Sequence, residues 1–400
     1  MNSKLIGGIL LVVGSTIGAG ILALPVATAE LGFLGSVVLL TSAWLIMTIC
    51  AFLILEVNLW LPPGTNLISM AGATLGKTGQ SITWVVYLVL LYSIICAYIA
   101  GGGDLFHYLL VTTGIPISQN IASIIFTILF GSMVYLGMHF VDYVNRGLMF
   151  GKMGAFFLLV LFMVPFISFD HLGEGTIKHI VAPSGITVAA VSFGSLMIIP
   201  SLRTYFNGDV KSLRLAIFIG MIIPLICYVA WDMVVLGIIP LEGQPGLKGI
   251  LHSSNTNSEL LSALSVLLQK QSINSLAKFF TSICMTTSFL SISLCLADFL
   301  ADGLKMQKRG KESIVVYGAT FLPPLLIVLF YPNGFIRALQ YAGVCCFVLM
   351  IFLPPLMVWR GRYHQALAQE GHGVIGGKFL LAVLVLFATL MIGLGLEGSI

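Results

Sequence analysis

A short polar stretch, Gly14-Ser15-Thr16-Ile17-Gly18-Ala19-Gly20, lies inside an apolar run that extends from Leu5 to about Ala29. Its three glycines and two adjacent hydroxyl residues disfavour helix, since each glycine costs about 1 kcal/mol relative to alanine. In lipid, a broken backbone persists only where protein or a water-filled cavity satisfies its polar groups. The stretch therefore predicts a broken spanning helix with a buried site at the break. The alternative is close helix packing through the G-x-x-x-G motif of Gly14 and Gly18.

A second stretch, Ser192-Phe193-Gly194-Ser195, has the same character and is followed by Pro200. A half-helix that begins after a break offers free N–H groups and a positive dipole end, which suit a carboxylate. The carbonyls that end the preceding half-helix suit an ammonium group or a sodium ion. The two breaks together therefore fit the charged groups of an amino-acid zwitterion.

The position of the two breaks predicts which backbone groups bind the carboxylate and the amine of the substrate. We expect the carboxylate to bind the N–H groups of Ala19, Gly20 and Ile21. We expect the amine to meet carbonyls near Ser15, Thr16 and Ser192. Phe193 is placed either to cover a substrate side chain or simply to fill the interior, and the sequence favours neither.

Ionisable residues inside spans are costly and are candidates for function. Lys152 lies about 9 Å into its span, counted from Arg146 at 1.5 Å per residue. It is a candidate proton carrier, or its chain extends back to the membrane surface. Thr287 and Ser288 either supply hydroxyls to a cation site or hydrogen-bond to their own helix.

Three acidic residues are further candidates. Glu56 and Asp104 fall at the ends of spans, which predicts positions among lipid headgroups or at gates. Asp232 falls deeper within its span and is a stronger candidate for a buried role.

Composition defines the class of protein. The 400 residues are 58% hydrophobic and 8% charged, with a mean hydropathy of +1.06, which indicates a polytopic α-helical membrane protein. The seven cysteines are scattered through apolar runs without the spacing of a metal site or a disulfide. A G-x-G-x-x-G match at 393–398 ends the last apolar run and does not open a helix, so it does not indicate a nucleotide-binding loop. We therefore expect no enzyme, cofactor, metal ion or nucleic-acid partner. The predicted spans are 5–29, 33–58, 82–103, 119–139, 147–168, 184–206, 214–239, 276–303, 313–331, 335–359 and 375–396.

The basic residues predict an orientation. With a cytoplasmic N-terminus, fourteen of the nineteen lysines and arginines fall on the cytoplasmic side, including Lys308 and Arg309. This places the C-terminus in the periplasm. The longest loop on the periplasmic side, about 240–275, is polar and is expected to contain a short amphipathic helix.

The spacing of the two breaks predicts an internal repeat. They lie five spans apart, and because five is odd the second set of five spans enters from the opposite face. Paired broken helices in two inverted halves are typical of alternating-access transporters. We expect one transmembrane domain over residues 1–400, with repeats at 1–168 and 184–359 and an additional helix at 375–396.

The run at 14–25, G-S-T-I-G-A-G-I-L-A-L-P, resembles the first helix of bacterial tyrosine-specific permeases. These belong to the hydroxy and aromatic amino-acid permease family of the amino acid–polyamine–organocation superfamily. The similarity continues in order along nearly the whole chain, at Leu55-Glu56-Val57, Ala97-Tyr98-Ile99, Asn145-Arg146, Ser192-Phe193-Gly194, Thr287-Ser288-Phe289-Leu290 and Gln340-Tyr341-Ala342-Gly343-Val344.

The resemblance implies the leucine-transporter fold, with 5+5 inverted repeats and an eleventh helix. It also implies proton-driven import of an aromatic amino acid across the bacterial inner membrane. Segments 15–20 and 192–195 would hold the zwitterion near Tyr98. Lys152 would stand where sodium-coupled relatives bind an ion, with Thr287 and Ser288 lining that place. The chain departs from the family pattern at Ser195-Leu196, where an aromatic residue and histidine are usual.

The sequence thus predicts a proton-coupled symporter for aromatic amino acids, with tyrosine first and phenylalanine or tryptophan next. The alternatives are a sodium-coupled or serine/threonine transporter of the same fold, and a channel or amino-acid sensor built on this scaffold.

Overall fold

The computed structural model describes residues 3–136, 138–253, 255–307, 310–331, 334–367 and 373–397, and these ranges form helices without a strand. The longer helices are α1 (Ser3–Thr16), α2 (Gly20–Ala27), α3 (Gly32–Trp60), α4 (Leu67–Thr112), α5 (Gln119–Tyr135), α6 (Met138–Met163), α8 (Pro183–Ser192), α10 (Val210–Ile238), α12 (Thr256–Leu268), α13 (Gln271–Leu304), α14 (Lys311–Phe330), α15 (Gly334–Cys346), α16 (Leu353–Tyr363) and α17 (Gly377–Glu397). The shorter ones are η1 (Ala29–Leu31), η2 (Val164–Phe166), α7 (Phe169–Leu172), η3 (Ile177–Val181), η4 (Ser195–Ile198), α9 (Ile199–Tyr205), α11 (Leu247–Leu251) and the π-helix η5 (Phe347–Phe352).

The polytopic α-helical prediction is confirmed. Within the described residues, nine helices are long and apolar enough to cross a membrane, or ten if α1 and α2 form one bent span. The prediction of eleven spans is not matched, because the fourth, 119–139, is the 17-residue helix α5. Spanning helices have about 20 residues, with a range of about 17–25, so α5 lies at the lower limit of that length.

Two predicted spans have a different form in the structure. The span predicted at 82–103 belongs to α4, which has 46 residues and continues through a kink at Gly76. There φ is 79°, a conformation that glycine adopts without a steric penalty. The span predicted at 335–359 is interrupted by the six π-helical residues of η5.

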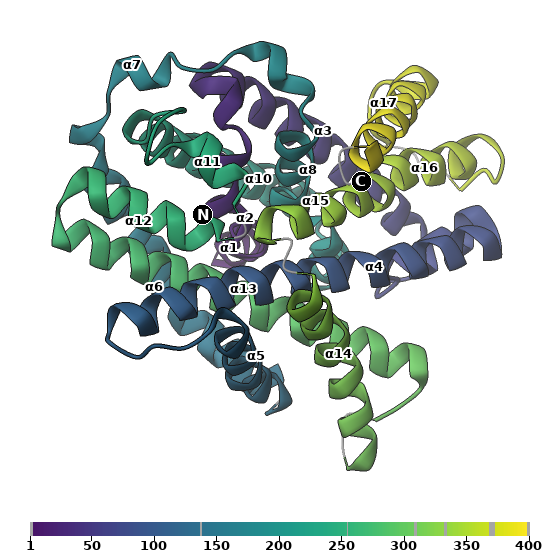
Figure 1. Ribbon diagram of the computed structural model, residues 1–400. Coiled ribbons are helices and arrows are strands. Elements are labelled where there is room, and N and C mark those ends of the chain that lie inside the picture. The colour runs from purple at the N-terminus through teal and green to yellow at the C-terminus, as the bar shows by residue number, and fades with distance from the viewer. Residues whose placement is uncertain are drawn as a thin grey trace.

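The short helix α2 lies among longer helices. Figure 1 shows α4 and α13 crossing the molecule, and the two helices pack against each other. Helix α1 packs on α10, whereas α15 packs on both α4 and α8. Helix α2 packs against α8 and α10, and all of its residues are buried. The breaks at the ends of α1 and α8 therefore lie in the protein interior rather than against lipid.

The loop helix predicted within 240–275 is confirmed as α12. Its apolar residues Leu260, Leu261, Leu264 and Leu268 are buried, and the helix packs on α13 and α4. The internal repeat and the membrane orientation stay predictions. Lys308 and Arg309, which contributed to the orientation, lie outside the described residues.

The expectation that Glu56 lies among headgroups is wrong, because its side chain is only 1% exposed. Arg362 donates from Nε and Nη2 to the two carboxylate oxygens of Glu56, at 2.6 Å each. The N–H of Val374 donates to the same carboxylate at 2.8 Å. This bidentate pair ties α3 to α16 and to the segment that enters α17.

Replacing Glu56 with alanine should lower the thermal unfolding temperature in detergent. The change leaves a mostly buried guanidinium without its partner, at a cost of about 3–5 kcal/mol. The matched control is Glu242→Ala, because Glu242 pairs with Lys248 at 3.6 Å on the surface. Exposed pairs contribute little. Equal unfolding temperatures for Glu56→Ala and the native protein would show that the pair does not stabilise the fold.

Candidate functional site at two helix breaks

The first predicted break is present. Helix α1 ends at Thr16, residues 17–19 are not helical, and α2 begins at Gly20. The axes of the two helices differ by 54°. The glycines and hydroxyl residues thus interrupt the span where the sequence indicated.

The second predicted break is also present. Helix α8 ends at Ser192, Phe193 and Gly194 are not helical, and the chain continues through η4 into α9. The break is a short 3₁₀ turn between two helices rather than a long loop.

The two breaks lie against each other. The hydroxyl oxygens of Thr16 and Ser195 lie 2.7 Å apart, within hydrogen-bond distance. A Cβ atom placed on Gly20 would lie 2.7 Å from Oγ and 3.3 Å from Cα of Ser192. Only glycine permits such a close approach at position 20. The fold therefore joins segments 16–20 and 192–195 into one cluster of polar backbone and hydroxyl groups.

Tyr228 on α10 connects the ends of both half-helices. Its hydroxyl lies 2.8 Å from the carbonyl oxygen of Thr16 and 2.8 Å from that of Ser192. Its ring is fully buried and packs edge-on against Phe193, with ring centroids 5.2 Å apart. Phe193 is itself fully buried. Tyr228 thus supplies a donor for carbonyls that a continuous helix would have satisfied.

The three N–H groups predicted for a carboxylate differ in their present partners. Ala19 donates to Oγ of Ser288 at 2.9 Å, and Ile21 donates to the carbonyl of Gly18 at 3.4 Å. Within the described part of the chain, the N–H of Gly20 donates no hydrogen bond. The binding of a carboxylate by these N–H groups stays a prediction. Among the three, the N–H of Gly20 is the one without a hydrogen-bond acceptor in the described residues.

Lys152 points into the first break rather than toward the membrane surface. Its side chain is 2% exposed, and Nζ donates to the carbonyl of Ile17 at 2.7 Å. The ammonium group satisfies a carbonyl that the break has freed. The two neighbouring hydroxyl residues on α13 behave differently. Ser288 contacts Ala19, whereas the hydroxyl of Thr287 donates to the carbonyl of Ile283 in its own helix.

Gly18 brings α4 and α13 close to the break. A Cβ atom on this residue would lie 2.8 Å from Oγ of Ser288 and 3.9 Å from the hydroxyl of Tyr98. Tyr98 therefore lies near the site, as the resemblance implied. Ser15 stands apart, because it is exposed and its hydroxyl donates to the carbonyl of Val12.

The two other acidic candidates are buried and lie outside this cluster. Asp232 is fully buried, and one of its oxygens accepts hydrogen bonds from Thr28, at 3.2 Å, and from Ser36. Asp104 is 2% exposed, which corrects its expected place among headgroups, and it accepts from the N–H of Ser258 at 2.9 Å.

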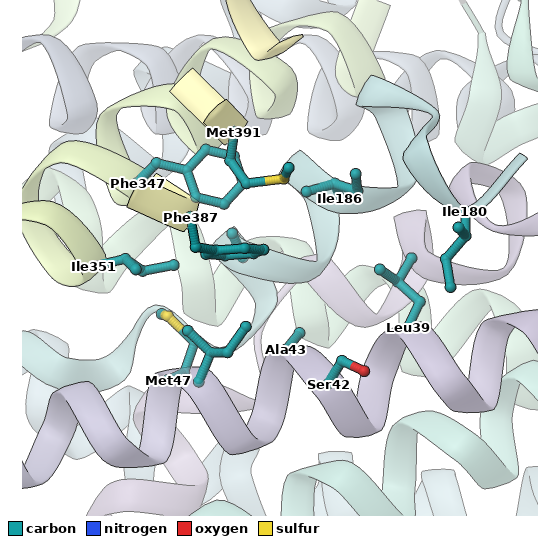
Figure 2. A pocket seen from close by; sticks show the side chains of 12 residues that line it. Leu39, Ser42, Ala43, Met47, Ile180, Ile186, Phe347, Ile351, Phe387 and Met391 are labelled. Carbon is teal, nitrogen blue, oxygen red and sulfur yellow. The ribbon is translucent and has the colours of Figure 1, made fainter. Parts of the chain in front are cut away.

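A separate apolar pocket of about 230 Å³ lies among α3, η3, α8, η5 and α17 (Figure 2). Figure 2 shows Ser42 as the one labelled lining residue with a side-chain oxygen, beside Leu39, Met47, Phe347 and Phe387. Such walls offer no partner for either charge of a zwitterion. We therefore place the candidate site at the breaks.

Sequence reasoning missed Tyr228. A tyrosine within an apolar span also occurs wherever a ring packs and its hydroxyl finds a partner. The one available signal was its place, the middle of the span that follows the second break.

Known proteins resemble this chain along its whole length. The sequence profile of the tryptophan/tyrosine permease family matches residues 1–394. Tyrosine-specific transport system 1 of Haemophilus influenzae is 35% identical over 97% of this chain and 96% of its own length. A tryptophan-specific transport protein of the same organism is 31% identical, over 98% and 95%. Glutamine transporter 2 of Aliivibrio fischeri is also 31% identical, over 98% and 99%.

Alanine at position 20 should destabilise the protein. The added methyl group meets the backbone and hydroxyl of Ser192, and such overpacking costs about 1–3 kcal/mol. Gly154→Ala is the matched control, because nothing lies within 4 Å of a Cβ atom at this position on α6. Thermal unfolding in detergent should give a lower midpoint for Gly20→Ala and an equal or higher one for Gly154→Ala. Equal midpoints for Gly20→Ala and the native protein would contradict the close contact between the breaks.

Proposed function

The chain belongs to the tryptophan/tyrosine permease family, and we propose that it is a proton-coupled symporter that imports aromatic amino acids, with tyrosine as the first substrate. Phenylalanine and tryptophan follow as secondary substrates. The protein is a multi-pass membrane protein, and we assign it to the bacterial inner membrane with a cytoplasmic N-terminus.

The contact between the two breaks supports an amino-acid substrate. The carbonyls of Thr16 and Ser192 end their half-helices, and the N–H of Gly20 begins the next one. These groups offer acceptors for an ammonium and a donor for a carboxylate within one cluster. Tyrosine, tryptophan and glutamine, the amino acids in the names of the relatives, share this zwitterion. Each of their side chains also ends in a hydrogen-bonding group, so the side chain must decide specificity.

The observation that carries the proposed coupling is the bond from Lys152 to Ile17. A buried ammonium that contacts a broken helix can change the stability of the break when it gains or loses its proton. While the group is protonated, its positive charge also disfavours a sodium ion nearby. The hydroxyl of Thr287 donates to the carbonyl of Ile283 in its own helix, so its oxygen keeps lone pairs and this bond does not distinguish a proton from sodium.

The same arrangement supports alternating access as the proposed mechanism. In the proposed leucine-transporter fold with 5+5 inverted repeats, the helices that contain the breaks would rock against a scaffold that includes α4, α6 and α13. The bonds of Lys152 and Ser288 to residues 17–19 would then join the moving part to the scaffold. Loading a proton or substrate at these bonds would bias the movement.

Uptake of labelled tyrosine into proteoliposomes tests the function. We expect saturable accumulation under an imposed pH gradient without sodium, abolished by an uncoupler and competed by aromatic amino acids. Uptake driven by sodium alone would overturn the proton coupling. Binding without flux would indicate a sensor, and flux that does not saturate would indicate a channel.

Lys152→Ala should abolish accumulation of tyrosine driven by a pH gradient, because the ammonium that joins α6 to the first break is lost. Exchange of labelled for unlabelled tyrosine needs no net proton movement and should be retained. Lys178→Ala, which changes an exposed lysine, is the control and should behave as the native protein does. Accumulation by Lys152→Ala at the native level would refute the coupling role.

A further inference from the structure

Asn257, in the first turn of α12, is a buried amide without a partner. Its side chain is 1% exposed, and neither Oδ1 nor Nδ2 forms a hydrogen bond within the described residues. Buried amides are almost always hydrogen-bonded, since an unpaired donor or acceptor is costly. Two such atoms at one position make it a candidate for binding a polar group.

The start of α12 is fixed against α4. The carboxylate of Asp104 accepts hydrogen bonds from both the N–H and the hydroxyl of Ser258, the residue after Asn257. These bonds hold the first turn of α12 in one place. The Asn257 amide is therefore positioned by its neighbours without taking part in the bonds itself.

The amide lies where three long elements meet. A Cβ atom on Gly101 would lie 2.6 Å from Nδ2 of Asn257, 2.8 Å from Cε of Met285 and 3.0 Å from Cδ2 of Phe335. Gly101, Met285 and Phe335 belong to α4, α13 and α15, respectively. Because Gly101 has no side chain, the Asn257 amide can occupy this space.

This place is close to the two helix breaks. Gly101 follows Tyr98 by three residues on α4, and Met285 precedes Ser288 by three residues on α13. Tyr98 and Ser288 are the side chains nearest to Gly18 of the first break. Three residues span about one helical turn, a rise of about 5 Å. The side chain of a tyrosine is longer than that, so its hydroxyl can extend from the breaks to this level.

We propose that Asn257 binds the phenol hydroxyl of the substrate and selects tyrosine over phenylalanine. The assignment rests on the proposed function and adds a specificity-determining residue to it. Oδ1 accepts the hydrogen of the phenol, and Nδ2 donates to the phenol oxygen. Phenylalanine leaves both amide atoms unpaired in a closed site. Buried polar groups of this kind reject an analogue that lacks the hydroxyl.

The test compares competition by tyrosine and by phenylalanine in proteoliposomes loaded for exchange. In Asn257→Leu, which keeps the size and removes the amide, the half-inhibitory concentration of tyrosine should rise about tenfold or more. That of phenylalanine should change by less than about threefold, because phenylalanine makes no bond to the amide. Asn257→Ala gives the same comparison if leucine impairs membrane insertion.

Ser258→Ala is the matched control, because it loosens the same turn through Asp104 while keeping the amide. It should weaken both amino acids by a similar factor. Equal weakening of both by Asn257→Leu would assign the residue a structural role and overturn the proposal. A native protein that does not distinguish tyrosine from phenylalanine would overturn it as well. Failure of the native protein to exchange any aromatic amino acid would overturn the proposed function itself.

Discussion

The structure depends on one constraint, that backbone groups released by a broken helix inside a bilayer must find partners within the protein. The carbonyls of Thr16 and Ser192 meet the hydroxyl of Tyr228, and the carbonyl of Ile17 meets Lys152. The N–H of Ala19 meets Ser288. Helices α10, α6 and α13 thus each contribute a polar side-chain atom at the level of the breaks. In the proposed function, these atoms that stabilise the breaks are also the ones that meet the substrate and the proton.

The breaks and Lys152 were predictable because their signals are local. Glycine, serine and proline inside an apolar run disfavour helix wherever they occur, and a lysine within such a run is rare enough to notice. Tyr228 and Asn257 were not predictable in this way. Tyr228 contacts residues 212 and 36 positions away, and Asn257 is significant only because none of the described residues pairs with its side-chain amide. Such properties arise from the tertiary fold.

Errors at the ends of spans have the same origin. Glu56 reads as a headgroup residue because it falls near the end of an apolar run, yet its partner Arg362 is 306 positions away. Likewise, the predicted spans 33–58 and 82–103 leave residues 59–81 outside any span, although α4 already begins at Leu67 and passes through a kink at Gly76. Hydropathy indicates which segments are apolar, whereas neighbours decide where a helix ends and which charges are buried.

The contact of Tyr228 with two carbonyls has a consequence for the timing of events at the breaks. A phenol carries one hydrogen, so at any instant it can bond to the carbonyl of Thr16 or to that of Ser192, and not fully to both. Only one of these two helices can therefore receive the hydrogen at a time. A cation that bound one of the carbonyls would leave the hydrogen of Tyr228 for the other. In the proposed transporter, occupancy at one break would then be sensed at the other break through a rotation about a single C–O bond.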